Sequence, residues 1–594
     1  MIKKLLLSIF TALLVFNISF SHAANETNNS VNLKEKAFKT LSDALFDEKI
    51  HYNIKIDIFD IINNFITEDL PPESPEDLVQ DFYQNMIDNP DQSTFTIDLL
   101  NNDQQESSED IKKPAETDKN IIELLKKTVE SDNDNIILYG LDSISKGKVK
   151  ELLPDVIIKL KNFDSDDLEV ETSLISTIGK IGNDSAIETL QPYLDDENLR
   201  IKLNALQAIG DIKTENANKI LKEYVSKDSL ELALLSSGIL VNEGDEKALK
   251  LLQEGIESPI ILTQQKTMIA ISNVTNPVIL PLIKIALKSD NDVIKAYALN
   301  NLGKIDTIES VKLIQPYIED EKLMPRAIIA LSQNSSKEAF RILESMMKSD
   351  NNIQKTYIIA VLSRIKDKRI LPLLKIALDD KNENISIAAA KILHTFEDDS
   401  GIDALKIAIK SNNEDISLRA AAFLGYIGDN TGQSILLNAI DDTNLPSWKR
   451  LDISIILEKL GDKGIVPKLK ELLSKQRPKT LPKDLNPSAK TLKEFIKDDS
   501  VWVQLNSAVF LIRNKDSDCL PILEKLSNDP DLLVRTTAVD LLGELGSEKA
   551  LPVLNKSLED ESVRVRVKAA ESIIKILSAQ KTHKNIKEKS NTPT

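Results

Sequence analysis

Cysteine is almost absent from this 594-residue chain, and aromatic residues make up only 4% of it. A single cysteine, Cys519, excludes an internal disulfide, so packing alone must hold the fold together. Few aromatic residues leave aliphatic side chains to fill the interior. Leu, Ile, Ala and Lys dominate instead, which is typical of amphipathic helices packed through aliphatic ridges.

Basic residues are outnumbered, with 75 Lys and Arg against 93 Asp and Glu, a formal net charge of -18 and a pI near 5.0. Binding to nucleic acid requires a concentrated basic surface. We therefore expect no nucleic-acid partner.

Long apolar runs are missing except at the start of the chain. Lys3 and Lys4 precede an apolar stretch over 5–20, and Ser21-His22-Ala23 places small residues where a signal peptidase reads them. We predict a signal peptide over 1–23, cleaved between Ala23 and Ala24, and a periplasmic or secreted mature chain of net charge -20 without stable membrane insertion. A retained anchor is the alternative, although the run is short for a spanning helix.

A period of about 31 residues organises most of the chain. The stretch around Ala538 recurs with the same layout, and the steps from Leu174 onward are 31, 31, 31, 31, 29, 31, 31, 31, 33, 54, 31 and 31. All of these steps except one lie within two positions of the same value, so this is a repeat protein. The anchor positions are Gly140, Leu174, Ala205, Ser236, Thr267, Ala298, Ala327, Ile358, Ala389, Ala420, Ile453, Ser507, Ala538 and Ala569.

Each repeat contains two amphipathic segments separated by a short turn. A glycine such as Gly179 or Gly543 is expected to end the first helix, and a second one such as Gly546 to form the turn. One repeat cannot bury its own apolar faces, so its neighbours must stack on it. The predicted fold class is an all-α solenoid, a superhelix of about 14 two-helix repeats.

The repeats resemble the HEAT family, specifically the short repeats first described in phycobilisome lyases. The resemblance rests on the repeat length, on an Ala…Leu-Gly-x-Ile-Gly signature, and on a proline early in the second helix. It covers residues 121–578 and implies a solenoid, but its motif consists of packing residues and indicates little about activity. The prolines are Pro281, Pro372, Pro467, Pro521 and Pro552.

Three regions fall outside the period. Residues 24–98 contain helical patterns over 33–46, 54–66 and 75–87, which could form an N-terminal cap. Residues 99–120 are polar and acidic, as expected of a linker, and 579–594 form a polar tail predicted to be disordered. The repeat array is predicted to span 121–578.

Residues for catalysis or metal binding are scarce. The mature chain contains His51, His394 and His583, none followed by Glu, which argues against a di-iron site of the kind built on HEAT-like repeats. Cys519 aligns with the buried position of Ala550, so packing explains it better than nucleophilic chemistry. We predict no cofactor, no metal and no enzymatic activity.

Nine cations recur at two outward positions of the second helices, against four acidic residues there. Because second helices of HEAT-like solenoids typically line the concave side, we expect a basic stripe along the inner face, for an acidic or mixed-charge partner. An ordinary solvated face is the alternative. The nine are Lys219, Lys222, Lys250, Lys284, Lys312, Arg341, Lys375, Lys406 and Lys470.

The longest step contains an insertion over 475–497, rich in lysine and interrupted by three prolines, which predicts a projecting loop. The two tryptophans of the chain, Trp448 and Trp502, each lie five residues before an anchor on either side of it. Basic residues near tryptophan are favoured at interfaces, whereas packing of the loop by the tryptophans is the alternative. The candidate cations of the insertion are Arg477, Lys479 and Lys483.

The sequence therefore predicts an exported, non-catalytic scaffold that binds an unidentified protein partner along its inner face. Two alternatives remain: a lyase-like or cofactor-handling enzyme, and a structural or assembly factor of the cell envelope.

Overall fold

The computed structural model describes residues 30–66 and 118–590, except for 165–166, 227–228, 273 and 366, and only the backbone of 580–590. The predicted signal peptide, the third helical pattern (75–87) and most of the predicted linker lie outside these residues. Among the described residues, no helix combines the length and the apolarity needed to cross a bilayer.

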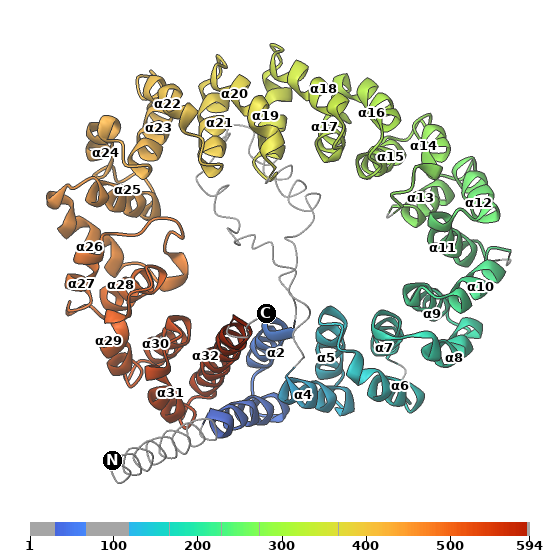
Figure 1. The fold of residues 1–594 in the computed structure, drawn as a ribbon, viewed down its shortest axis with the longest axis horizontal. Helices are drawn as coiled ribbons and strands as arrows, with labels where there is room; N and C mark the ends of the chain where they lie inside the picture. The colour runs from blue at the N-terminus through green and yellow to red at the C-terminus, as the bar shows by residue number, and fades with distance from the viewer. Residues whose placement is uncertain are drawn as a thin grey trace, which may run out of the picture. The chain divides into compact units, whose positions relative to one another are not determined.

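The chain folds into helical pairs stacked side by side (Figure 1). The first helices of the pairs are α5 (Asp134–Lys146), α7 (Leu168–Ile181), α9 (Leu199–Ile212), α11 (Leu230–Leu240), α13 (Ile261–Ala270), α15 (Asp292–Lys304), α17 (Met324–Gln333), α19 (Asn352–Leu362), α21 (Glu383–Thr395), α23 (Glu414–Tyr426), α25 (Ser447–Lys459), α28 (Val501–Arg513), α30 (Leu532–Leu545) and α32 (Val563–Ser590).

The second helices are shorter, and most begin with a turn of 3-10 helix. They are α6 (Leu153–Lys161), α8 (Ile187–Leu190), α10 (Glu215–Tyr224), α12 (Glu246–Ile256), α14 (Leu280–Ala286), α16 (Ile308–Ile314), α18 (Lys337–Met347), α20 (Leu371–Leu378), α22 (Ile402–Ala408), α24 (Gln433–Ala439), α26 (Val466–Ser474), α29 (Leu520–Leu526) and α31 (Leu551–Ser557).

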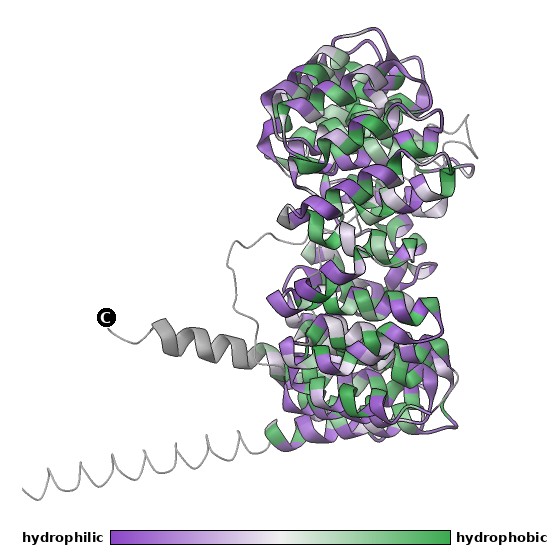
Figure 2. Cartoon of the chain, turned by 90° about the vertical axis from the view of Figure 1, so that its right-hand side faces the viewer, coloured by the Kyte–Doolittle hydropathy of each residue, from purple (hydrophilic) through white to green (hydrophobic). Residues whose placement is uncertain are grey.

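The predicted all-α solenoid and its period are confirmed. Every one of the 14 anchor positions lies in a first helix and is buried; Ala205, Ala298 and Ala538 have no exposed surface. Hydrophobic and hydrophilic residues are mixed along the helices (Figure 2). First helices such as α21 bury long consecutive runs, because they pack against both neighbouring first helices and second helices.

A polar residue seven positions before the anchor starts most first helices. Asn133, Asn198, Asn351 and Asp531 are N-caps whose side chains accept a hydrogen bond from a backbone N–H of the first turn. Such caps satisfy donors that the helix leaves unpaired, and each is worth about 1 kcal/mol.

Glycines near the ends of the first helices do not end them, contrary to the prediction. Gly179 lies inside α7, and a Cβ placed on it would lie 2.5 Å from the Cα of Ala208 in α9. Glycine is required there because neighbouring first helices approach closely. The second glycine does act as predicted at Gly546, which has φ 66° and caps α30 in a left-handed conformation.

The described residues fall into two compact units. The central unit runs from Thr128 to Ala439, and the terminal unit combines residues 30–66, the start of α4 (Lys119–Glu130) and everything from Ile440 onward. Both chain ends therefore belong to one unit.

In the central unit the first helices form the inner side of a curved row, and the second helices form its outer side (Figure 1). The prediction that second helices line the concave side is therefore wrong for this unit. The close approach of first helices at Gly179 and Gly303, each opposite an alanine of the next first helix, explains the direction of curvature.

In the terminal unit, the N-terminal helices cover the end of the repeat array. The helix of residues 30–46 and α2 (Tyr52–Ile66) lie beside α32, which has no second helix of its own. Lys34 Nζ lies 2.5 Å from the Asp118 carboxylate and 3.4 Å from Ser578 Oγ, while Lys36 pairs with Glu559 at 3.0 Å. The predicted N-terminal cap thus touches the start of α4 as well as the last repeats.

The insertion over 475–497 is a packed partial repeat, and the prediction of a projecting loop is wrong. Leu481 and Leu485 are buried in its extended part, and α27 (Ala489–Phe495) buries Leu492 and Phe495 against α28. The prolines do prevent a helix over 481–488, but the apolar side chains between the charges still anchor the segment.

The C-terminal tail also differs from the prediction of disorder, because α32 continues to Ser590. Residues 579–590 contain Ala, Gln, Glu and several Lys, all of which have a high helix propensity.

We predict that Gly179→Ala lowers the free energy of unfolding by about 1–3 kcal/mol, because the new methyl group meets backbone atoms of Ala208 and the helices must move apart. Urea denaturation followed by circular dichroism measures the loss. Gly464→Ala is the control, since the closest contact of its new Cβ is the side chain of Asp462 at 3.2 Å. Equal stability of Gly179→Ala and the native chain would contradict close helix approach.

Candidate partner-binding surfaces

The nine cations of the predicted stripe lie on second helices, and five of them bind the following part of the array. Lys375 Nζ lies 2.9 Å from Asp398, and Lys406 Nζ lies 2.8 Å from Asp429. Both aspartates cap the 3-10 turn of the next repeat. The other three pairs are Lys222 with Asp245, Lys284 with Glu309, and Lys470 with Asp498.

The remaining four cations are not used in this way. Lys250 and Arg341 pair within their own helices, with Glu254 and Glu338, and Lys219 and Lys312 make no ion pair with the described residues. Over much of its length, the predicted basic stripe therefore stabilises the stacking of one repeat on the next. It is not a continuous free basic surface.

The electrostatics of the pairs agree with their geometry. The Lys406 ammonium, helped by Thr431, lowers the pKa of Asp429 to about 2. Asp429 in turn raises the pKa of Lys406. In the insertion, Asp518 and Asp516 raise the pKa of Lys493 to about 12. Lys493 and Asp516 have the same separation along the chain as Lys406 and Asp429, so α27 occupies the place of a second helix.

Around the insertion, the structure brings together Arg477 and Trp502, whose ring centre lies 3.8 Å from the guanidinium carbon. Trp448 lies beside its own neighbour Lys449, at 5.5 Å. Trp502 is half-buried, and Arg477, Lys479 and Lys483 are exposed. The stack agrees with the alternative in which a tryptophan packs the insertion onto the array.

A surface that sequence inspection missed lies on α13. Ile260, Ile261, Leu262 and Ile269 are 61%, 51%, 58% and 54% exposed, and we call these four residues the α13 patch. They are a quarter of the sixteen large hydrophobic residues exposed in the described chain, within ten positions. Single exposed hydrophobic residues are ordinary, but a cluster marks an interaction surface.

The α13 patch breaks the local rule for starting a first helix. Ile260 stands seven residues before its anchor, where most other repeats have Asn, Asp or Ser. α13 has no side-chain cap, a feature that it shares with α11, α17, α25 and α28. An uncapped start costs about 1 kcal/mol. What distinguishes α13 is a large aliphatic residue at this position, since Ile260 supplies no cap and is 61% exposed.

The patch lies at the start and along the length of a first helix of the central unit. Leu262 and Ile269 are seven residues apart and share one side of α13, and first helices line the inner side of the row (Figure 1). Of residues 258–272 only Lys266 is charged, and it pairs with Glu231 of α11 at 2.7 Å. Leu230 of α11 and Val293 of α15, the first helices on either side of α13, are also exposed, at 37% and 50%.

Comparison with known families identifies the repeats. A family model of HEAT repeats matches residues 154–237 and 489–574. These two segments consist of HEAT repeats. The finer resemblance to the repeats of phycobilisome lyases stays a prediction.

Solved structures with a similar arrangement are larger HEAT-type solenoids. They include a complex of Kap95 with Nup1 (12% identity, 95% of this chain and 85% of that one, TM-score 0.37), importin beta (11%, 96% and 87%, 0.31), and karyopherin Kap121p bound to the SUMO protease Ulp1p (11%, 91% and 70%, 0.32). A search of curated protein sequences finds no match.

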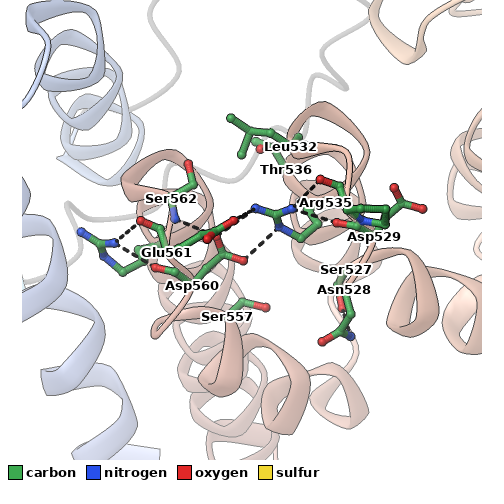
Figure 3. A network of polar contacts seen from close by, with 12 residues as sticks. Ser527, Asn528, Asp529, Leu532, Arg535, Thr536, Ser557, Asp560, Glu561 and Ser562 are labelled. Carbon is green, nitrogen blue, oxygen red and sulfur yellow. Dashed lines mark hydrogen bonds and ion pairs between the residues drawn. The ribbon is translucent and has the colours of Figure 1, made fainter.

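A recurring polar contact three residues before the HEAT anchor was also missed. Arg535 Nη1 donates to the carbonyl of Asp529 at 2.8 Å, and the other nitrogens reach Asp560 and Glu561 of the next inter-repeat turn (Figure 3). Gln504 and Arg566 likewise donate to the carbonyl six residues before them. A long polar residue between two buried positions of an amphipathic helix is the signal that could have revealed it.

The reactive side chains of the HEAT array have structural surroundings. Burial raises the pKa of the Cys519 thiol to about 11, so it stays protonated at neutral pH. His394 contacts Asp399 and the rings of Phe423 and Tyr426, beside a hollow of about 10 Å³. That volume holds little more than one water molecule. No group of three potential metal ligands occurs within the described residues.

We predict that Arg535→Met lowers the free energy of unfolding by about 3 kcal/mol, because it leaves the largely buried Asp560 carboxylate without its cation. Urea denaturation measures the change, and exposed Arg564→Met is the matched control. A loss no greater than that of the control would show that the network in Figure 3 contributes little.

The Lys406–Asp429 pair predicts a dependence of stability on pH. The folded pKa of Asp429, about 2, lies below its ordinary 3.8, so the pair stabilises the fold above pH 4 and loses its effect as pH falls towards 2. Lys406→Met should be less stable than the native chain at pH 5, and the gap should narrow by pH 2.5. Denaturation midpoints across this range test it, with Lys410→Met as the control.

Proposed function

We propose that this HEAT-repeat chain is a non-catalytic scaffold that binds a protein partner on the open side of its first helices. The observation behind the proposal is the α13 patch, an exposed aliphatic cluster on a helix that lacks the usual cap. Burying such a cluster on association is favourable, at roughly 25 cal/mol per Å² of apolar surface.

The predicted basic stripe is a weaker candidate for the same role. Five of its nine lysines and arginines already pair with carboxylates beyond their own helix, and exposed cations of this kind add little affinity when they must exchange one carboxylate for another. Trp448 and Trp502 remain candidates for a second contact. Both are only half-buried.

Export of the chain stays a prediction from residues 1–23. N-terminal sequencing of the protein recovered from a periplasmic or culture fraction tests it. A mature chain beginning at Ala24 is the expected result, and an uncleaved chain in the cytoplasm would contradict it.

The binding proposal is tested with three sets of substitutions in the mature chain. Leu262→Asp with Ile269→Asp should weaken capture of the native partner about tenfold or more, because two charges would enter an apolar interface. Lys219→Glu with Lys250→Glu and Lys312→Glu, which leaves the pairs between repeats intact, should bind as the native chain does. Trp448→Ala with Trp502→Ala reports on the tryptophans.

Partners are captured on immobilised protein, identified by mass spectrometry and measured by titration of the purified partner. Circular dichroism of each variant confirms that it is folded. Unchanged affinity of the double aspartate variant, together with loss in the lysine or tryptophan variant, would move the site to the second helices or the insertion. Failure of the folded native chain to capture any protein would reject the scaffold.

A further inference from the structure

Carboxylates gather at the starts of α13 and of the neighbouring first helices α9, α15 and α17. They lie in the turns that lead into the first helices: Asp195, Asp196, Glu197, Glu257, Asp290, Asp292, Glu319, Asp320 and Glu321, which we call the acidic rim. In the same turns and the first helical turns that follow, the cations are Arg200, Lys202, Lys288, Lys295, Lys322 and Arg326. Two of them already pair with Asp292, Lys322 at 3.1 Å and Lys295 at 3.8 Å.

Part of the rim has a local task. Asp196 and Asp320 accept hydrogen bonds from backbone N–H groups two residues later, and negative charge stabilises the start of a helix. Asp195, Glu197, Asp290 and Glu321 make no such contact with the described residues, and these four are exposed.

Titration behaviour agrees with a negative local field. Burial, and then Asp196, raise the pKa of Glu171. Burial, Glu171 and Asp196 raise the pKa of Tyr193, and burial and Asp320 raise that of Tyr317. In each case, neighbouring carboxylates oppose the appearance of a further negative charge.

The rim and the α13 patch adjoin along the chain. Glu257 precedes Ile260 by three residues, and Asp292 directly precedes Val293. A ligand that covers the aliphatic side chains therefore reaches the carboxylates as well. The α13 patch and the acidic rim together are complementary to a ligand that has aliphatic groups flanked by positive charge.

We propose that the open side of α9 to α17 binds a cationic amphipathic helix of a protein partner, with its aliphatic residues on the α13 patch and its Lys or Arg residues on the acidic rim. This inference rests on the proposed function and specifies the partner for the same surface.

The spacing of the repeats favours a helix as the bound element. Neighbouring packed helices lie about 8–10 Å apart, and residues seven apart on a helix are separated by about 10.5 Å. A helix lying across α11, α13 and α15 can therefore place an aliphatic side chain beside Leu230, Leu262 and Val293 in turn. Fewer than three turns would reach only two of them.

The test uses two synthetic peptides with identical aliphatic sides, leucines spaced by three, four and seven residues, and either Lys or Glu on the polar side. Fluorescence anisotropy of each labelled peptide is measured with the full mature chain at low ionic strength. We expect the Lys peptide to bind about tenfold more tightly than the Glu peptide, and added salt to reduce the difference.

Two sets of substitutions separate the contributions. The rim variant, Glu197→Lys with Asp290→Lys and Glu321→Lys, should abolish the preference for the Lys peptide. The control variant makes the same change of charge on second helices, at Glu188→Lys, Glu223→Lys and Glu254→Lys. It should keep at least half of the native value of the logarithm of the affinity ratio between the two peptides. Leu262→Asp with Ile269→Asp should weaken binding of both peptides.

Equal affinity for the two peptides, or no binding of either, would overturn the cationic partner. Neither result would contradict the proposal that the chain is a scaffold, because that proposal is tested separately by capture of the native partner. Concentration-dependent dimers in light scattering that disappear in the double aspartate variant would assign the patch to a second copy and would also overturn this inference.

Discussion

Everything in this structure depends on how closely one first helix can approach the next. Where an inter-helix contact has glycine on one side and alanine or serine on the other, as at Gly179 with Ala208 and Gly543 with Ser572, the backbones meet without room for another carbon. Such contacts bring the first helices together, so the central unit curves towards them. The inward sides of the first helices, which no second helix covers, are left open to a ligand.

Charge is divided between two tasks in the array. On the second helices, lysines bind carboxylates of the following repeat, and Arg535 does the same from a first helix with less than a sixth of either side chain exposed. These pairs fix the register between repeats that share an apolar core. At the starts of the first helices, carboxylates exceed what capping requires and remain available. The net charge of -18 therefore comes from exposed carboxylates, whereas the contacts between repeats use ion pairs whose charges cancel.

The sequence predicted the helical pairs well, because each repeat contains the same two helices and its buried anchor residue therefore recurs at a nearly constant interval. It could not give the direction of curvature, which depends on which row of helices has the smaller contact residues. Reading Gly179 as a helix end was an error of the same kind, since a buried small residue and a helix terminator look alike in one dimension. In the insertion, the prolines and lysines led to the prediction of a projecting loop. The buried side chains of Leu481, Leu492 and Phe495, which hold the segment on the array, were not taken into account. In the sequence, the α13 patch shows only as an isoleucine where most other repeats have a polar residue, and the exposure of its side chains required the structure.

The central claim is that binding uses the inner aliphatic surface and that the outer lysines serve stacking. Hydroxyl-radical footprinting of the full chain, alone and with its purified partner, tests it most directly because the method labels side chains individually. Protection of Ile260, Ile261, Leu262 and Ile269, with unchanged labelling of the leucines and isoleucines next to Lys284, Lys375 and Lys406, is the predicted result. Protection confined to the second helices, with the α13 patch labelled equally in both states, would contradict the account.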